Sequence, residues 1–104
     1  MFKISVMYPN NEGARFDHDY YINSHIKLVE EHMTPFGLVK TEVDRGLPDE
    51  DGNRPLYICI GHMYFDKMDG YVKGSAEKGP VLRDDISNFT NVVPVRQLSE
   101  IINK

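Results

Sequence analysis

Apolar residues recur with two different periods along this chain, and the order of those periods limits the folds that it can adopt. They alternate with polar residues over positions 2–8 and 39–43, which is the period of a half-buried strand. Residues 56–65 are apolar on both faces, as in the centre of a sheet. A fourth strand is expected over residues 92–98. These four segments predict one sheet.

Two segments between these strands follow the helical period instead. The first covers residues 17–34, where Asp17 is the expected N-cap. The second begins after Asp66 and is expected to break at Gly79-Pro80, with a further helical turn over residues 81–86. The elements therefore follow one another in the order β-α-β-β-α-β.

That order predicts an α+β fold, the ferredoxin-like plait, in which a four-stranded antiparallel sheet carries both helices on one face. Residues 1–104 are expected to form a single domain. The other face of the sheet would be bare unless something covers it. A second copy packed sheet to sheet would do so, and the expected state is a homodimer, a dimeric α/β barrel.

Three histidines, His18, His25 and His32, are spaced seven residues apart in the first expected helix. Seven residues make almost two turns, so all three fall within about 20° of one line on the apolar side. The same spacing separates neighbours by about 10.5 Å, too far for one metal ion to bind two of them. We therefore expect no metal site. His18, exposed in the first turn, and His32, in the last, are interpreted as structural.

Charge and motif content exclude several classes of function. The formal charge of −4, without a cluster of basic residues, argues against nucleic acid or an anionic membrane as a partner. No apolar stretch approaches the roughly 20 residues that span a bilayer, and the first residues do not resemble a signal peptide, so a cytoplasmic protein is expected. The single cysteine, Cys59, is expected to be an inert buried thiol. No phosphate loop or dinucleotide fingerprint is present, so no cofactor is expected.

Several local strings resemble the motifs of one family in its order and spacing. They are Tyr8-Pro9, Phe16-Asp17, Tyr20-Tyr21, His25 with Leu28, Gly61-His62-Met63-Tyr64-Phe65 and Asp85-Ile86-Ser87-Asn88-Phe89-Thr90. The chain resembles the EthD family over essentially its whole length. This resemblance implies a dimeric ferredoxin-like fold with a small, largely apolar ligand near the helix and the sheet. Proteins of related architecture include cyclases, dehydratases, isomerases and monooxygenases, so the resemblance does not decide the reaction.

His25 is the first candidate for a catalytic residue, because it is central on the apolar side of the helix and matches the family's histidine position. An imidazole titrates near neutral pH, so its surroundings can make it a general acid or base. A packed core histidine is the alternative. His62 is the second candidate: it meets His25 in one cavity if its strand face meets the helix, and lies at the dimer interface if the phase is opposite.

Aromatic side chains are the candidates for substrate binding, because they offer flat apolar surfaces to a planar ligand. They are Phe16, Tyr20, Tyr21, Tyr64 and Phe89. Ordinary core packing is the alternative for each of them, for Phe89 above all.

Two functions follow from these residues. In the first, the protein is a cofactor-independent enzyme whose His25 moves a proton on a small hydrophobic or aromatic carbonyl compound, in a cyclisation, dehydration or isomerisation, with an oxidative variant possible. In the second, the pocket binds a hydrophobic metabolite without chemistry, as an accessory protein of an oxidative degradation or biosynthetic pathway.

Overall fold

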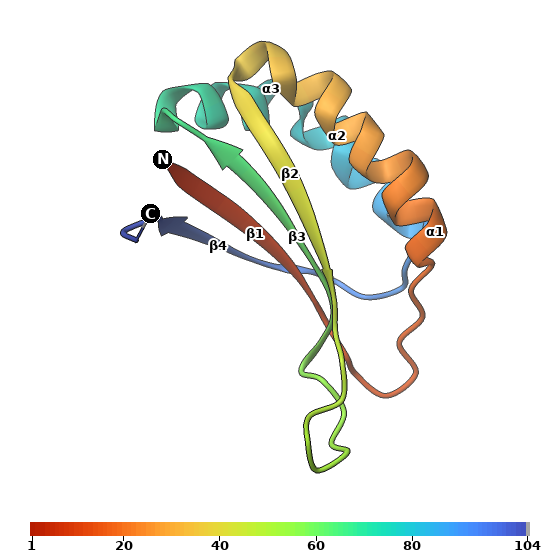
Figure 1. Cartoon of the computed structure of the whole chain (residues 1–104). Coiled ribbons are helices and arrows are strands. Elements are labelled where there is room, and N and C mark those ends of the chain that lie inside the picture. The colour runs from red at the N-terminus through yellow and green to blue at the C-terminus, as the bar shows by residue number, and fades with distance from the viewer. Residues whose placement is uncertain (104) are drawn as a thin grey trace.

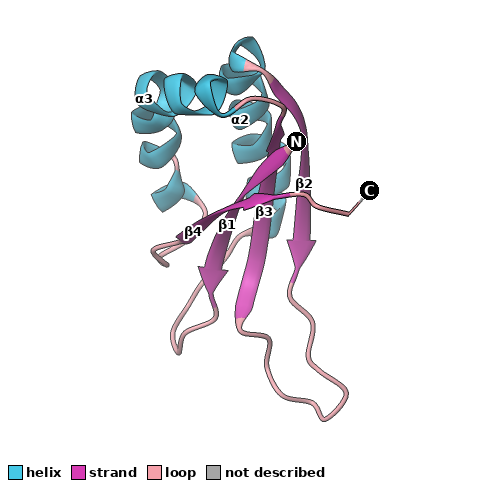
Figure 2. Ribbon diagram, turned by 90° about the vertical axis from the view of Figure 1, so that its left-hand side faces the viewer, coloured by secondary structure: helices cyan, strands magenta, loops and turns pink. Residues whose placement is uncertain are grey.

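A single four-stranded antiparallel sheet forms the centre of the computed structural model, which describes residues 1–103. Its strands are β1 (Phe2–Pro9), β2 (Leu38–Arg45), β3 (Tyr57–Phe65) and β4 (Val95–Glu100), in the spatial order β2-β3-β1-β4. The helices lie on one face of this sheet (Figures 1 and 2). The ferredoxin-like α+β fold expected from the sequence is therefore confirmed.

The helical segments differ in detail from the expected ones. They are α1 (His18–Tyr20), a π-helical turn (Tyr21–His25), α2 (Ile26–Met33), a 3₁₀ turn (Thr34–Phe36), α3 (Met68–Asp84) and a second 3₁₀ turn (Ile86–Asn88). The expected N-cap of the first helical stretch is present, because Asp17 Oδ1 accepts a hydrogen bond from the backbone N–H of Tyr20 at 3.0 Å.

The π-helical turn changes which side chains of the first helical stretch are buried. The backbone N–H of Ile26 donates to the carbonyl of Tyr21, five residues earlier, so this turn holds one residue more than an α-helical turn. Tyr21, His25 and Ile26 consequently all face the sheet. A regular helix would place Ile22 in the buried arc as well, but the wider turn leaves it 47% exposed.

The second helix is not broken at Gly79-Pro80. Its N-cap position is Lys67 rather than Asp66, without a capping hydrogen bond from the side chain, and the helix continues through Pro80 to Asp84. A residue before proline avoids the helical region chiefly because its Cβ and N–H crowd the proline ring, and Gly79 has no Cβ. The carbonyl that loses its N–H partner belongs to Ala76, which is exposed, as is Pro80. The break is therefore avoided at low cost.

The last strand begins later than expected, at Val95 rather than at residue 92. Pro94 has no N–H and cannot donate to a neighbouring strand, so regular pairing starts only after it. Val92 is buried instead in a loop, against the apolar cluster around Tyr8.

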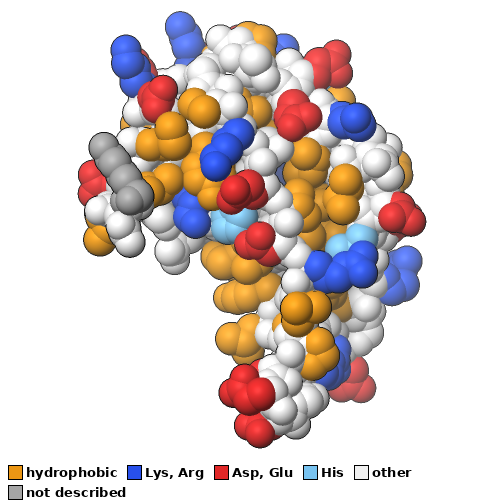
Figure 3. All heavy atoms as spheres, viewed as in Figure 1, with side chains coloured by type: hydrophobic (Ala, Val, Ile, Leu, Met, Phe, Trp, Pro, Cys, Tyr) orange, Lys and Arg blue, Asp and Glu red, His pale blue; other side chains and the backbone are white. Residues whose placement is uncertain are grey.

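The two faces of the sheet have different surroundings. Phe2 and Ile4 of β1 pack with Val29 and Met33 of α2, so the even-numbered side chains of this strand face the helices. The odd-numbered ones face the side that the helices leave bare. This matches the period-two alternation seen in the sequence. The connection between β2 and β3 extends beyond the sheet, and acidic side chains gather at its tip (Figure 3).

Gly61 decides how closely the first helical stretch approaches the sheet. A Cβ at this position would overlap the hydroxyl oxygen of Tyr21 and lie 3.2 Å from the ring carbon Cζ. The absence of a side chain at Gly61 therefore lets the hydroxyl end of Tyr21 approach the strand closely, and Tyr21 is 2% exposed. Close approach of this kind is a common reason for glycine inside a strand.

We expect the substitution Gly61→Ala to lower the free energy of unfolding by about 2 kcal/mol, because the added methyl group overpacks the space that holds Tyr21. The double variant Gly61→Ala/Tyr21→Phe removes the overlapping hydroxyl and should recover part of this loss. Urea unfolding of the wild type, both single variants and the double variant would measure the coupling energy. Strict additivity of the two substitutions would contradict the contact.

Candidate functional site

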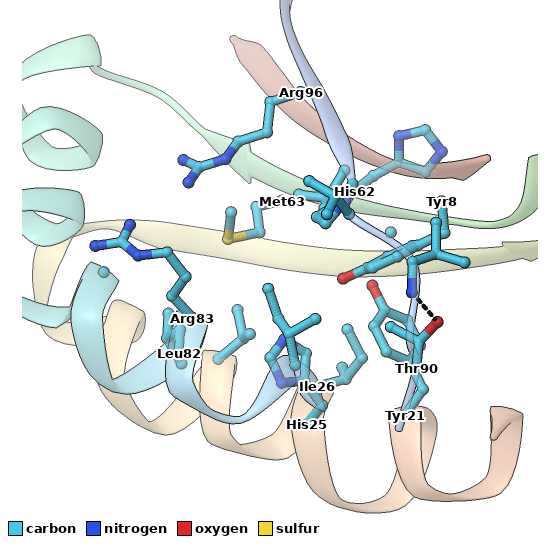
Figure 4. A pocket seen from close by; sticks show the side chains of 18 of the residues that line it. Tyr8, Tyr21, His25, Ile26, His62, Met63, Leu82, Arg83, Thr90 and Arg96 are labelled. Carbon is cyan, nitrogen blue, oxygen red and sulfur yellow. Dashed lines mark hydrogen bonds between the residues drawn. The ribbon is translucent and has the colours of Figure 1, made fainter. Parts of the chain in front are cut away.

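A cavity of about 600 Å³ lies between the helix-covered face of the sheet and helices α2 and α3 (Figure 4). β1 and β3 form its floor, and the segment from α3 to β4 closes one side. Among the residues that line it are Val6, Tyr8, Tyr21, His25, Ile26, Val29, Met63, Leu82, Thr90 and Arg96. A largely apolar hollow of this size, with a few polar groups, is typical of a site for a small molecule.

His25 is held in this wall by packing and by one strong hydrogen bond. Its ring stacks on Tyr21 with the centroids 5.4 Å apart and an angle of 18° between the planes, and it lies 4.7 Å from the ring of Phe89. Nδ1 lies 2.9 Å from Oδ2 of Asp85. Only 6% of His25 is exposed. The ring orientation is therefore fixed from both sides.

Asp85 holds several groups with one carboxylate. Its Oδ1 accepts from the hydroxyl of Tyr20 at 2.7 Å and from Nδ2 of Asn88 at 2.9 Å, while Oδ2 faces His25. Burial raises the pKa of Asp85, but the hydrogen bonds from Asn88, Tyr20 and His25 outweigh it, so the pKa lies below its ordinary value. Asp85 is therefore ionised at neutral pH.

His25 is the neutral partner of this pair. Burial lowers its pKa from the ordinary 6.5, and the nearby Asp85 carboxylate offsets only part of that effect. The contact is thus a hydrogen bond from a neutral imidazole rather than an ion pair at neutral pH. Since an ionised carboxylate only accepts, Nδ1 carries the proton and Nε2 keeps its lone pair. Within residues 1–103 Nε2 has no hydrogen-bond partner, and it is accessible from the cavity.

Four of the five candidate aromatic residues, all except Tyr64, gather around His25, but only one of them lines the cavity. Tyr21 does so, whereas Phe16 and Phe89 lie behind it, 5.2 and 5.0 Å from its ring. Tyr20 stacks on Phe89 at 6.2 Å and donates to Asp85. Phe16, Phe89 and Tyr20 are thus placed to support His25 and Tyr21 rather than to touch a ligand in this cavity.

His62 and Tyr64 point away from the cavity, to the bare face of the sheet. His62 pairs with Ser5 across the strands, and its Nδ1 lies 2.9 Å from Ser5 Oγ, while Nε2 lies 2.8 Å from Asp44 Oδ2. The Tyr64 hydroxyl donates to Glu42 at 2.6 Å, which raises the Tyr64 pKa to about 12. Figure 4 shows the His62 side chain leaving the strand on the far side. His62 is among the residues at the cavity wall, but its imidazole lies on the bare face, so the rings of His25 and His62 do not meet in the cavity.

The two other histidines of the first helical stretch lie outside the cavity. His18 is half-buried rather than exposed as expected, because its ring packs 4.8 Å from Phe16, and its Nε2 is buried without a partner among residues 1–103. His32 is half-buried near the end of α2. Within residues 1–103, no group of three or more His, Cys, Asp or Glu residues could hold a metal ion.

The sequence did not single out several residues that build this site. Asp85 opens one of the EthD-like strings, but its partner His25 is 60 positions away, so only the fold brings them together. Tyr8 also opens such a string, and its hydroxyl faces that of Tyr21 at the cavity (Figure 4). Burial raises the pKa of both tyrosines well above the ordinary value, so both hydroxyls keep their protons and can donate.

Comparison with known proteins gives matches among solved structures. An EthD-like protein from Ralstonia eutropha JMP134 is 31% identical, with a TM-score of 0.92 over 99% of this chain and 93% of that one. An ethyl tert-butyl ether D (EthD) family protein from Bacillus halodurans C-125 is 20% identical, with a TM-score of 0.74 over 98% and 99% of the two chains.

A third structure, a dimeric ferredoxin-like protein from an uncultured marine organism, shares the fold with a TM-score of 0.55 at 14% identity, over 100% of this chain and 97% of that one. No family model matches the sequence, and no curated protein matches it either. Within residues 1–103, none of the helices is both long enough and apolar enough to cross a membrane.

The neutral state of buried His25 predicts a pH dependence of stability. Because its pKa is lowered on folding, the unfolded chain binds more protons near and below pH 6.5, so the free energy of unfolding should fall as the pH falls through that value. The slope contributed by one such group is at most about 1.4 kcal/mol per pH unit. Urea unfolding between pH 8 and 5 measures it.

Two variants serve as controls for this slope. His25→Asn removes the titrating group and should flatten the curve in this range. Asp85→Asn removes the carboxylate that raises the His25 pKa, so the fall in stability should extend to lower pH. A wild-type protein that gains stability as the pH falls through 6.5 would contradict the assignment of a neutral His25.

Proposed function

The chain belongs to the EthD family, and from the cavity beside His25 we propose that it is a small enzyme that moves a proton on a hydrophobic or aromatic carbonyl compound without a cofactor. The observation that carries this proposal is the position of the His25 ring, which Asp85 holds through Nδ1 while Nε2 is left open to a largely apolar cavity. A neutral imidazole held in one tautomer and one orientation is a suitable general base.

The proton transfer can be written from the residues present. Nε2 takes a proton from the carbon next to the substrate carbonyl; the electron pair of that C–H bond forms a C=C bond, and the π pair of the C=O bond moves onto oxygen to give an enolate. The imidazolium that forms is stabilised by the Asp85 carboxylate, 2.9 Å from Nδ1. Tyr8 and Tyr21, both protonated, can donate hydrogen bonds to the enolate oxygen.

Return of the proton decides the reaction class. If the enolate is conjugated with a second C=C bond and Nε2–H gives the proton to the far carbon of that bond, the double bond shifts and the substrate is isomerised. If the proton goes to a departing hydroxyl group, water is lost and the reaction is a dehydration. If the enolate carbon first attacks a second carbonyl, the proton goes to the new alkoxide and a ring closes. All three begin with the same step at His25.

The second candidate function is binding without chemistry. The position of His62 favours this function. His62 is the second candidate for an acid or base, but its ring lies on the opposite face of the sheet, hydrogen-bonded to Ser5 and Asp44, so it cannot assist His25. The imidazole that faces the cavity is that of His25. In this case His25, Asp85 and Tyr21 would shape a pocket for a hydrophobic metabolite that serves an oxidative degradation or biosynthetic pathway.

A homodimer formed through the bare sheet face belongs to the same proposal. On that face Met7 lies between Ile60 of β3 and Val95 of β4, which gives an apolar row across three strands. The polar groups of His62 and Tyr64 beside this row are already hydrogen-bonded within the chain. A second copy could therefore bury the face without leaving them unpaired. A structural neighbour described as dimeric shares the fold.

The proton-transfer step can be tested without knowing the natural substrate. We expect the wild-type protein to accelerate the exchange of the hydrogens next to the carbonyl of β-tetralone, an aromatic ketone, in deuterium oxide. His25→Asn should lose about 100-fold or more of this acceleration, since that is the ordinary contribution of a general base. Asp85→Asn should show a smaller loss. Proton NMR measures the rate.

His32→Asn is the matched control, because it changes a histidine of the same helical stretch outside the cavity and should keep the wild-type rate. Binding of neutral phenylnaphthylamine, read by fluorescence, shows whether each variant retains its cavity. Equal exchange rates in the wild type and His25→Asn, with intact binding, would refute catalysis by His25 and leave the binding function.

The proposed dimer can be tested by placing a charged side chain within the apolar row on the bare sheet face. Ile60→Glu should convert a dimer to a monomer, since the buried carboxylate would have no partner in the interface. Light scattering during size-exclusion chromatography measures the mass. Val72→Glu, on an exposed part of α3, is the control and should stay dimeric. A monomeric wild type would contradict the proposed assembly.

A further inference from the structure

Two arginines face the cavity from different elements. Arg83 is near the end of α3 and Arg96 is in β4, and both line the cavity wall. Figure 4 shows their guanidinium groups directed at the same end of the cavity, away from Tyr8 and Tyr21. Within residues 1–103 no ion pair or hydrogen bond engages either guanidinium group. The proposed reaction at His25 does not use them.

The guanidinium group of Arg83 lies beside Gly79 and Ser75 on the cavity side of α3. Its Nη1 lies 3.8 Å from the point where a Cβ of Gly79 would be, and the Oγ of Ser75 lies 3.8 Å from the same point. Ser75, Gly79 and Arg83 are one helical turn apart, so they form one strip of the cavity wall. Because Gly79 has no side chain, this strip leaves room beside a guanidinium group and a hydroxyl group.

Arg96 approaches the same space from the sheet. It pairs with Val6 of β1, whose side chain lines the cavity, so Arg96 leaves β4 on the helix-covered side. Helix α3 and strand β4 thus each bring one positive charge to the same end of a largely apolar space. Neither charge is neutralised there by a carboxylate of the cavity wall.

Two guanidinium groups at one end of an apolar cavity favour an anion between them. The two cations repel each other, and an anion offsets that repulsion. The planar fork of arginine matches the geometry of a carboxylate with two parallel hydrogen bonds. The other end of the cavity, at Tyr21 and His25, is lined by flat aromatic rings that suit an apolar body.

We propose that the ligand of this cavity is an amphipathic organic acid, whose anionic group lies between Arg83 and Arg96 and whose apolar or aromatic body lies against Tyr21 and His25. This inference rests on the proposed function of the cavity as a ligand site and specifies the class of compound. It also orients the ligand, because the anionic end is held away from His25 and the carbonyl group is presented to Nε2.

The test uses two probes that differ in one charged group. Anilinonaphthalene sulfonate and phenylnaphthylamine share the same aromatic body, and only the first carries an anion. We expect the wild type to bind the sulfonate about fivefold or more tightly than the neutral probe, since a charge-assisted hydrogen bond that is partly open to water contributes about that much. Displacement of the neutral probe by the sulfonate shows that both occupy one site.

Arg83→Gln and Arg96→Gln should each weaken sulfonate binding by about threefold to tenfold and change the affinity for the neutral probe by less than twofold. Lys73→Gln is the matched control, because it removes one positive charge from the exposed side of α3 and should change neither affinity. Circular dichroism and thermal unfolding establish that the variants are folded.

The outcomes separate this inference from the function on which it rests. If both probes bind the wild type equally, or if the arginine variants keep the preference for the sulfonate, the anion site is refuted and the cavity remains a ligand site. If neither probe binds the wild type, the cavity does not take such ligands, and the proposed function fails together with the inference.

Discussion

The hydrogen bond between His25 Nδ1 and Asp85 is the interaction on which the candidate site depends. It joins the first helical stretch to the segment before β4, across 60 positions of the chain. The same carboxylate also accepts from Tyr20, on the turn before His25, so it binds that stretch at two points. Both contacts require the helical stretch to be rotated so that Tyr20 and His25 face Asp85. The π-helical turn from Tyr21 to His25 provides this rotation.

The two ends of the cavity differ in charge. At one end lie two tyrosines that burial keeps protonated and a histidine that burial keeps neutral. At the other end lie Arg83 and Arg96. Burial thus favours the uncharged forms at the end where we propose that a proton is moved, and the partly open end carries the charges that we propose bind an anionic group. One sheet face and two helices supply both environments.

The sequence predicted the elements better than their details. Alternation in β1 and the apolar face of the first helix follow from local periods, and they are correct except at Ile22. The π-helical turn and the passage of α3 through Pro80 depend on packing and on the missing Cβ of Gly79, which a periodic pattern does not record. The face of His62 was undecidable because β3 is apolar on both sides, and the register with Ser5 decides it. Asp85 was missed because its partner is distant in sequence.

The most direct test of this account is the protonation state of His25, read from the nitrogen chemical shifts of its imidazole ring by NMR. The account predicts a neutral ring at pH 7 with the proton on Nδ1 and a free lone pair on Nε2, and a titration midpoint below 6.5. Asp85→Asn should lower that midpoint further. A ring protonated on Nε2 alone, or a midpoint above 6.5 in the wild type, would contradict the assignment of His25 as a base poised at the cavity.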